Sequence, residues 1–265
     1  MKISPTDPLL KDLKRMDPER FSSLLFAPKD RQSGLAVLYA FNMELGFVRE
    51  RSLREPMAGH IRLQWWRDAL SSGAGGAPLA EAVLALKLDP TDLQALIDAR
   101  EIDLSPDPPD SLDDLEDYAE ATGGALQELA AKWLGGDEAA CETARLAGTA
   151  YALLGLMRAL PFHAALGRRH LPQDLLPGAI TGPSAALNGA VEQVVDLAAD
   201  GLGRVRLAQV PRFARAPCLC ALQADTHLKR LRRAGYNPFD ARLKIPATRP
   251  LALWWGMIYT SLQNE

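Results

Sequence analysis

The most acidic stretch of the chain is a candidate metal site. Four carboxylates fall within five residues, at Asp113, Asp114, Glu116 and Asp117, and carboxylate oxygens are the ligands that magnesium takes in proteins. Ser111 lies two residues before them, however, and serine is a preferred N-cap residue. Acidic side chains in a first helical turn also interact favourably with the helix dipole. We therefore interpret the cluster as the solvated start of a helix rather than as a metal site.

The three cysteines, Cys141, Cys218 and Cys220, are candidates for a disulfide or a zinc site. The Cys218-x-Cys220 pair has no second pair, and the four histidines lie far away in the sequence. A structural zinc site needs four ligands in a recognisable pattern. We expect three reduced thiols.

Arg158 and His163 are the chemically capable side chains beside a long apolar stretch. Arg158 follows the uncharged run 146–157, where it can meet an anionic headgroup or pair with a buried acid such as Glu44 or Glu50. A buried charge without a partner is costly, so we favour the ion pair. His163 is followed by an apolar turn, and we expect a hydrogen-bonded core histidine rather than a ligand.

The elements that must position these residues are helices. Alanine and leucine dominate the sequence and β-branched runs are absent, which is typical of an all-α protein. Apolar residues recur at helical spacing over 35–51. The run 146–157 carries no charge, which predicts that a helix at 137–160 is buried on every side. We expect helices 35–51 and 144–160 to lie side by side at the centre of a single domain.

Shorter helices complete the expected fold. One is predicted at 7–26, with an interruption at Asp17 and Pro18, and another follows a break at 56–59. Further helices are predicted at 78–88, 91–103, 184–208 and 211–235 and at the C-terminus. Gly123 and Gly124 predict a kink or a close backbone approach. Because adjacent helical residues point about 100° apart, we expect one of Trp65 and Trp66 to be buried. We also expect Arg62 or Arg67 to be held by a nearby acid.

Composition and charge exclude several classes of function. The chain has 265 residues, of which 48% are hydrophobic and 24% charged, enough for one substantial core. Its net charge of −3 argues against nucleic acid as a binding partner, because proteins that bind nucleic acid are usually basic. We expect no secretory signal. The longest uncharged apolar run, 146–157, is shorter than the roughly 20 residues of a membrane span. We expect a soluble, cytoplasmic protein, with peripheral contact at a membrane left open.

Two stretches resemble the squalene and phytoene synthases. Leu38-Tyr39-Ala40-Phe41 looks like the LYAF that opens the first aspartate-rich helix of this family, and 148–176 aligns without gaps on the second. Arg158 is retained, and so is the closing segment, at Gly167, Arg168, Leu171 and Pro172. The segments AFNMEL and RLQWWRD resemble a diverged branch of this family more than its usual motifs. That branch includes a mitochondrial assembly factor for respiratory complex I. The resemblance implies an all-α, single-domain bundle of the class I isoprenoid synthase type over 1–265.

Most of the acids that the family uses are missing. The six positions where its two motifs carry acids are here Gly46, Phe47, Glu50, Ala159, Phe162 and His163. In the family these acids hold magnesium against the diphosphate of the substrate, whose departing charge the metal neutralises. Five of the six are absent. The resemblance therefore implies an apolar cavity that is either packed shut or filled by a neutral, lipid-like tail.

The resemblance leaves three functions open. The favoured one is a non-catalytic family member that acts in respiratory complex I assembly, with complex I subunits or assembly intermediates as partners, peripheral at the inner membrane. The second is a prenyl-lipid binding protein. The third is an active prenyltransferase that joins allylic prenyl diphosphates with magnesium. Family position implies Glu50, Arg158, His163 and Arg168 as substrate-binding residues. No catalytic residue, metal ligand or cofactor is expected, except magnesium if the enzyme interpretation holds.

Overall fold

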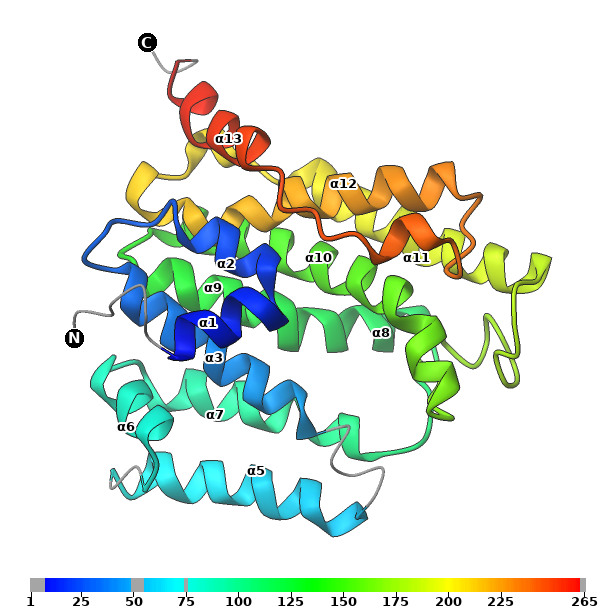
Figure 1. The fold of residues 1–265 in the computed structure, drawn as a ribbon, viewed down its shortest axis with the longest axis horizontal. Coiled ribbons are helices and arrows are strands. Elements are labelled where there is room, and N and C mark those ends of the chain that lie inside the picture. The colour runs from blue at the N-terminus through cyan, green and yellow to red at the C-terminus, as the bar shows by residue number, and fades with distance from the viewer. Residues whose placement is uncertain (1–7, 49–54, 74–75, 263–265) are drawn as a thin grey trace.

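One long helix, α10 (Glu138–Ala165), runs through the middle of the structure, and several other helices pack against it (Figure 1). The computed structural model describes residues 8–48, 55–73 and 76–262, and these ranges contain helices and no strand. The main neighbours of α10 are α9 (Ala125–Trp133), α11 (Ala185–Arg204) and α12 (Cys220–Arg233). The all-α fold predicted from the sequence is confirmed.

The sequence explains why α10 is long and central. Asp137 caps its N-terminus by accepting a hydrogen bond from the backbone N–H of Ala140 at 2.9 Å, which satisfies one of the open donors there. No charge falls between Arg145 and Arg158, and most of this run is buried, as such a pattern predicts. The predicted burial on every side is only partly correct, since Ala152, Gly155 and Leu156 are half-buried. Pro161 lies inside the helix, which continues past the predicted end at residue 160.

A pair of glycines lies where the chain approaches α10 most tightly. The π-helical turn η2 (Glu120–Gly124) joins α8 (Leu112–Ala119) to α9. A Cβ added at Gly123 would lie 2.5 Å from the Cβ of Ala152 and 2.7 Å from the carbonyl oxygen of Gly148. A Cβ added at Gly148 would collide with the Gly123 carbonyl. Side chains at these positions would therefore force the two segments apart, and the predicted close backbone approach is confirmed.

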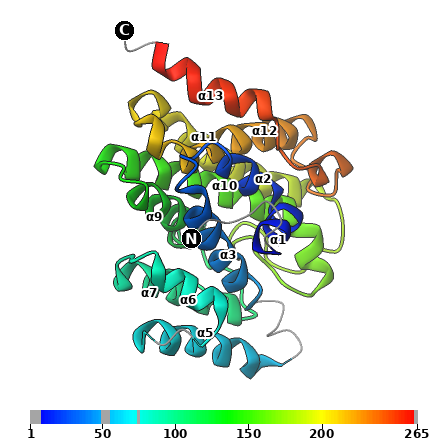
Figure 2. The ribbon, with the colours of Figure 1, turned by 60° about the vertical axis from the view of Figure 1, so that its left-hand side comes forward.

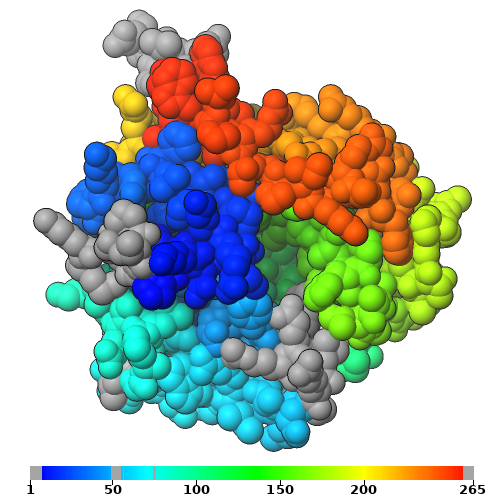
Figure 3. Space-filling model, in the orientation of Figure 1, coloured from blue at the N-terminus to red at the C-terminus, as the bar shows by residue number. Residues whose placement is uncertain are grey.

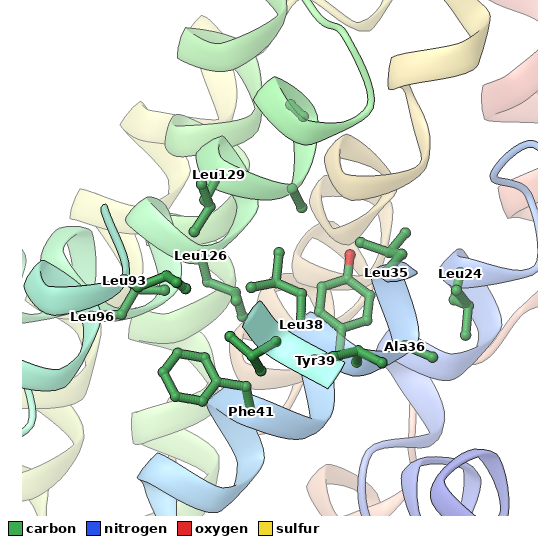
Figure 4. Packing of buried hydrophobic residues seen from close by; sticks show 14 of the residues in the cluster. Leu24, Leu35, Ala36, Leu38, Tyr39, Phe41, Leu93, Leu96, Leu126 and Leu129 are labelled. Carbon is green, nitrogen blue, oxygen red and sulfur yellow. The ribbon is translucent and has the colours of Figure 1, made fainter. Parts of the chain in front are cut away.

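Helix α3 (Gln32–Gly46) is the core of the N-terminal half. Its residues 35–41 are at most 4% exposed. Figure 4 shows Leu38 of α3 and Leu126 of α9 in the same group of packed side chains. The hydroxyl of Tyr39 donates to Gln127 Oε1 on α9 at 3.0 Å. Helix α9 is thus joined to α3 by both apolar and polar contacts.

The prediction that helices 35–51 and 144–160 lie directly side by side is wrong, although both are buried near the centre. Helix α3 packs mainly against α6 (Pro78–Ala85) and α1 (Pro8–Met16), while α9 contacts both α3 and α10. The pattern of apolar residues indicates that a helix is buried, but it does not identify the neighbour. Helix α3 also ends at Gly46, and residues 49–51 lie outside the described ranges.

The remaining helices lie close to their predicted positions. They are α2 (Pro18–Leu24), α5 (Pro56–Ser71), α7 (Pro90–Asp98), η1 (Glu101–Leu104), η3 (Leu207–Gln209), η4 (Arg212–Ala214), η5 (Ala216–Leu219), η6 (Ala241–Lys244) and α13 (Pro250–Leu262). The interruption at Asp17 is confirmed, since this residue caps α2. Two boundaries differ at prolines. Helix α5 begins at Pro56, inside the predicted break, because proline suits a first helical position. Helix α12 begins only after Pro217, which cannot continue a helix from its N-terminal side.

The Trp65 and Trp66 pair on α5 behaves as its helical geometry predicts. Trp66 is buried against Phe41 with the rings edge to face, and Trp65 is half-buried. Arg62 stacks over the ring of Trp65 and pairs with Glu44 at 2.6 Å. A second arginine, Arg67, is also held, by Asp98 and Glu101. These expectations are confirmed, and the segment belongs to the packed structure (Figure 2).

We expect Gly148→Ala to lower the free energy of unfolding by about 1–3 kcal/mol, because the added methyl group forces α10 away from η2. The matched control is Gly155→Ala on the same helix, where a Cβ would have no heavy atom within 4 Å. There the better helix propensity of alanine should stabilise the protein by up to about 1 kcal/mol. Urea unfolding followed by circular dichroism measures both changes. Equal effects would show that the close approach of the two backbones is not required.

Candidate functional site

Several positions of the two family motifs border open space. A Cβ added at Gly46, at the end of α3, or at Gly155, on α10, would have no described heavy atom within 4 Å. Ala159 is half-buried, and Phe162 is 55% exposed. Figure 3 shows a hollow between the N-terminal helices in blue and the green segment that includes α10. Among the described residues, none therefore packs against Gly46 or Gly155 at these positions. Glu50 lies outside the described residues.

His163 and Arg168 lie together at the end of α10. His163 is buried, as expected, and its ring lies 4.4 Å from that of His170 in an edge-to-face arrangement. The backbone N–H of Arg168 donates to the carbonyl of His163 at 2.9 Å. The guanidinium of Arg168 is also buried, and it donates to the carbonyl oxygens of Asp103 and Ser105. In this arrangement Arg168 fixes the segment that follows η1.

A polar network that the sequence analysis did not predict lies beside Arg168. Arg100 donates to Asn42 Oδ1 at 2.9 Å and pairs with Asp103 at 3.3 Å. The hydroxyl of Tyr118 donates to the other oxygen of Asp103 at 2.9 Å. The network therefore joins α3, η1 and α8 next to a pocket of about 190 Å³, which Arg168 also lines. In the sequence, only the closely spaced charges of 96–105, which include Arg100 and Asp103, indicate a polar contact there.

Arg158 lies in a different cluster, centred on a buried carboxylate. Glu19 on α2 is 3% exposed. Its Oε1 accepts the backbone N–H of Ala247 at 2.6 Å and lies 2.8 Å from His227 Nε2. Its Oε2 accepts the hydroxyl of Tyr151 at 2.6 Å. The guanidinium of Arg158 completes the cluster at 3.7 Å from Oε1.

The expected ion pair of Arg158 is therefore present, but the predicted partner is wrong. Glu44 pairs with Arg62 at 2.6 Å, and Arg158 pairs with Glu19. Arg158 also donates through Nε to the carbonyl of Leu243 at 3.0 Å. Nothing in the sequence distinguishes Glu19 from an ordinary first-turn acid, because its partners come from distant parts of the chain.

The charge state of this cluster follows from its contacts. Burial alone raises the pKa of Glu19, but the hydrogen bond from His227, the charge of Arg158 and the Tyr151 hydroxyl outweigh it and hold the pKa at about 2. Burial lowers the pKa of His227, and the positive charge of Arg158 adds to this effect. At neutral pH Glu19 is therefore ionised and His227 is neutral. The Nε2 atom of His227 lies within hydrogen-bond distance of both the Glu19 carboxylate, at 2.8 Å, and the Arg158 guanidinium, at 2.9 Å.

These charge states do not suit catalysis by the cluster. A general base works best when its pKa lies near the operating pH, whereas Glu19 stays ionised and enclosed. The thiols are equally unreactive, since burial raises the pKa of Cys218 and raises that of Cys220 to about 12. Among the described residues, no three His, Cys, Asp or Glu side chains are placed to hold a metal ion. Ser111 and Asp114 form the expected helix cap instead.

The helical fold and the two motif segments define the class of protein. The family model described as squalene/phytoene synthase matches residues 13–249, and the chain belongs to this family. Two solved structures share the fold. One is a dehydrosqualene synthase in complex with ligand, with a TM-score of 0.79, 17% identity and coverage of 97% of this chain and 96% of that one. The other is a squalene synthase from Alicyclobacillus acidocaldarius, with a TM-score of 0.68, 24% identity and coverage of 87% and 94%.

Within the family, curated relatives carry two different kinds of name. The complex I assembly factor 6 of Mus musculus is 27% identical over 251 residues, which are 88% of this chain and 75% of that protein. Its counterpart in Rattus norvegicus is 28% identical, over 91% of this chain and 78% of that protein. A presqualene diphosphate synthase from Rhodopseudomonas palustris is 26% identical over 59% of this chain and 58% of that protein. The chain is thus a diverged member of the family.

We expect Glu19→Gln to lower the free energy of unfolding by about 3 kcal/mol at pH 7, because the variant leaves Arg158 without its buried partner. The folded-state pKa of Glu19 lies below the ordinary value of 4.5, so its stabilisation is complete above that value and disappears as the pH falls towards 2. The difference between wild type and variant should therefore shrink over this range in urea unfolding. The exposed Glu81→Gln is the control, with an effect near zero. A pH-independent difference would contradict the assignment.

Proposed function

We propose that this protein is a non-catalytic member of the squalene/phytoene synthase family that helps to assemble respiratory complex I. The observation that carries the proposal is a retained family fold with five of the six motif acids replaced. Of the replaced positions, Gly46 has no described heavy atom within 4 Å of an added Cβ, Ala159 is half-buried and Phe162 is 55% exposed. Relatives from mouse and rat that match most of the chain bear the name of complex I assembly factor 6, which supports the role.

The chemistry of prenyl transfer explains why the missing acids matter. Ionisation of an allylic diphosphate leaves a group with several negative charges, and magnesium held by carboxylates neutralises them. Losing a single preorganised charge-stabilising group typically costs about 10²–10³ in rate. The described positions offer glycine, phenylalanine and alanine where the family has acids, and His163 is a softer ligand that suits zinc or iron better than magnesium.

A second candidate is the binding of a neutral prenyl lipid without turnover. The space beside α10 is bordered by Gly155, Ala159 and Phe162, which are apolar. An apolar lipid tail can lie against such a wall without a bound metal ion or charged side chains. This function is compatible with the assembly role, since a lipid could be bound in the course of assembly.

We expect no conversion of farnesyl or geranylgeranyl diphosphate to a head-to-head product in the presence of magnesium. The assay incubates the purified protein with radiolabelled farnesyl diphosphate and measures squalene, its cyclopropyl intermediate and released pyrophosphate. The Rhodopseudomonas palustris relative named as a presqualene diphosphate synthase serves as the positive control. Turnover that disappears in Glu50→Gln would mean that the protein is an enzyme with a rebuilt metal site. Binding of the diphosphate without turnover agrees with the proposal.

We expect deletion of the gene in its own organism to reduce the amount of assembled complex I, measured by native gel and NADH oxidation. Wild-type protein and the Glu50→Gln variant should both restore the complex, because the proposed role needs no metal. Normal complex I in the deletion strain would contradict the assembly role. Lipid is then extracted from the purified protein. A bound prenyl lipid, together with normal complex I in the deletion strain, would support the second candidate alone.

A further inference from the structure

The C-terminal helix α13 is apolar on all sides. Residues 250–262 contain no charged side chain, and such a helix is normally buried all round or placed in a membrane. Thirteen residues of helix extend about 20 Å, less than the roughly 30 Å of a bilayer core. In agreement, no helix among the described residues has the length and hydropathy to cross a membrane.

One face of α13 is docked on the protein. Leu253 and Met257 are buried with Leu219. Gly256 lies so close to the protein that an added Cβ would be 2.5 Å from Leu222 Cδ1. The buried guanidinium of Arg215 donates to the carbonyl of Met257 at 3.0 Å. This face fixes the position of α13 at the edge of the molecule (Figure 1).

The other face of α13 presents large apolar side chains to solvent. Leu251 is 77% exposed, Trp254 50% and Trp255 53%, and the two indole rings lie 6.1 Å apart, edge to face. Apolar surface of this kind on a helix already anchored to the protein indicates an interaction site.

The charge of the surrounding chain identifies the partner. Residues 201–262 contain eleven Lys or Arg and two Asp or Glu, which gives this part of the chain a net charge of +9. The remaining residues contain nineteen Lys or Arg and thirty-one Asp or Glu, which gives them a net charge of −12. Helix α13 contacts η3, η5 and α12 of this positive part of the chain at the upper edge of the molecule (Figure 1). Exposed cations next to η3, η5 and α13 in the sequence are Arg206, Arg212 and Arg249.

We propose that α13 and its basic surroundings bind the surface of an anionic lipid bilayer, with the helix lying in the plane of the interface. Tryptophan rings concentrate at the boundary between lipid headgroups and hydrocarbon. A helix with an apolar face, anchored beside Lys and Arg, binds anionic lipids through apolar burial and electrostatic attraction together. This inference is independent of the proposed function, because it rests only on the C-terminal side of the molecule.

The test is flotation of the full-length protein with vesicles. Vesicles of phosphatidylcholine alone are compared with vesicles that also contain phosphatidylglycerol, at low and high salt. The wild-type protein should float with the anionic vesicles and lose binding at high salt, since ions screen exposed charges. Trp254→Ser with Trp255→Ser, and separately Arg206→Gln with Arg212→Gln and Arg249→Gln, should each weaken binding by about tenfold or more.

The matched control is Met57→Ser with Ile61→Ser, which removes two exposed apolar side chains from α5 on the opposite side of the molecule and should leave binding unchanged. Circular dichroism and thermal melting establish that each variant folds. The proposal is overturned if the wild type does not float with anionic vesicles, if it binds neutral vesicles equally well, or if the tryptophan variant binds like the wild type. If vesicles are not bound but a protein is retained by the wild type and lost by the tryptophan variant, the occupant is a protein and the proposal is wrong.

Discussion

The buried carboxylate of Glu19 is the constraint on which the arrangement of the helices depends. Removing an ionised carboxylate from water costs several kcal/mol unless partners replace the water. Those partners are Tyr151 and Arg158 on α10, His227 on α12 and the backbone of Ala247. The carboxylate is satisfied only when α2, α10, α12 and the segment before α13 are all in place. The charge thus specifies one packing of four segments that apolar contacts alone would specify less sharply.

This arrangement also explains how a family member can lose its acidic motifs and keep its fold. The internal charges that stabilise the protein are paired at Glu19 and in the network around Asp103. The motif position Gly46, in contrast, has no described heavy atom within 4 Å of an added Cβ, and Phe162 is 55% exposed. Residues that contact little contribute little to stability, so their replacement changes the chemistry of the space without disturbing the core. Fold and catalytic residues are therefore separable in this chain.

Much of the fold could be predicted because it depends on local sequence. The cap at Ser111, the burial of Trp66 and the close approach at Gly123 each follow from residue type and helical geometry. The choice of neighbours could not be predicted in this way. The sequence suggests Glu44 or Glu50 as the partner of Arg158, yet the partner in the structure, Glu19, comes from a helix near the N-terminus. A pattern in one segment reports burial, whereas the identity of a distant partner depends on the whole topology.

The bond between Glu19 and the backbone of Ala247 has a consequence for the synthesis of the protein. The two residues are 228 positions apart, and at about 5–20 residues per second the ribosome needs roughly 10–50 s to complete this interval. During that time the nascent chain carries Glu19 without its full set of partners, since Tyr151 and Arg158 are synthesised before His227 and Ala247. Contacts between such distant residues slow folding. The cluster at Glu19 can therefore be completed only after the C-terminal segment has been synthesised.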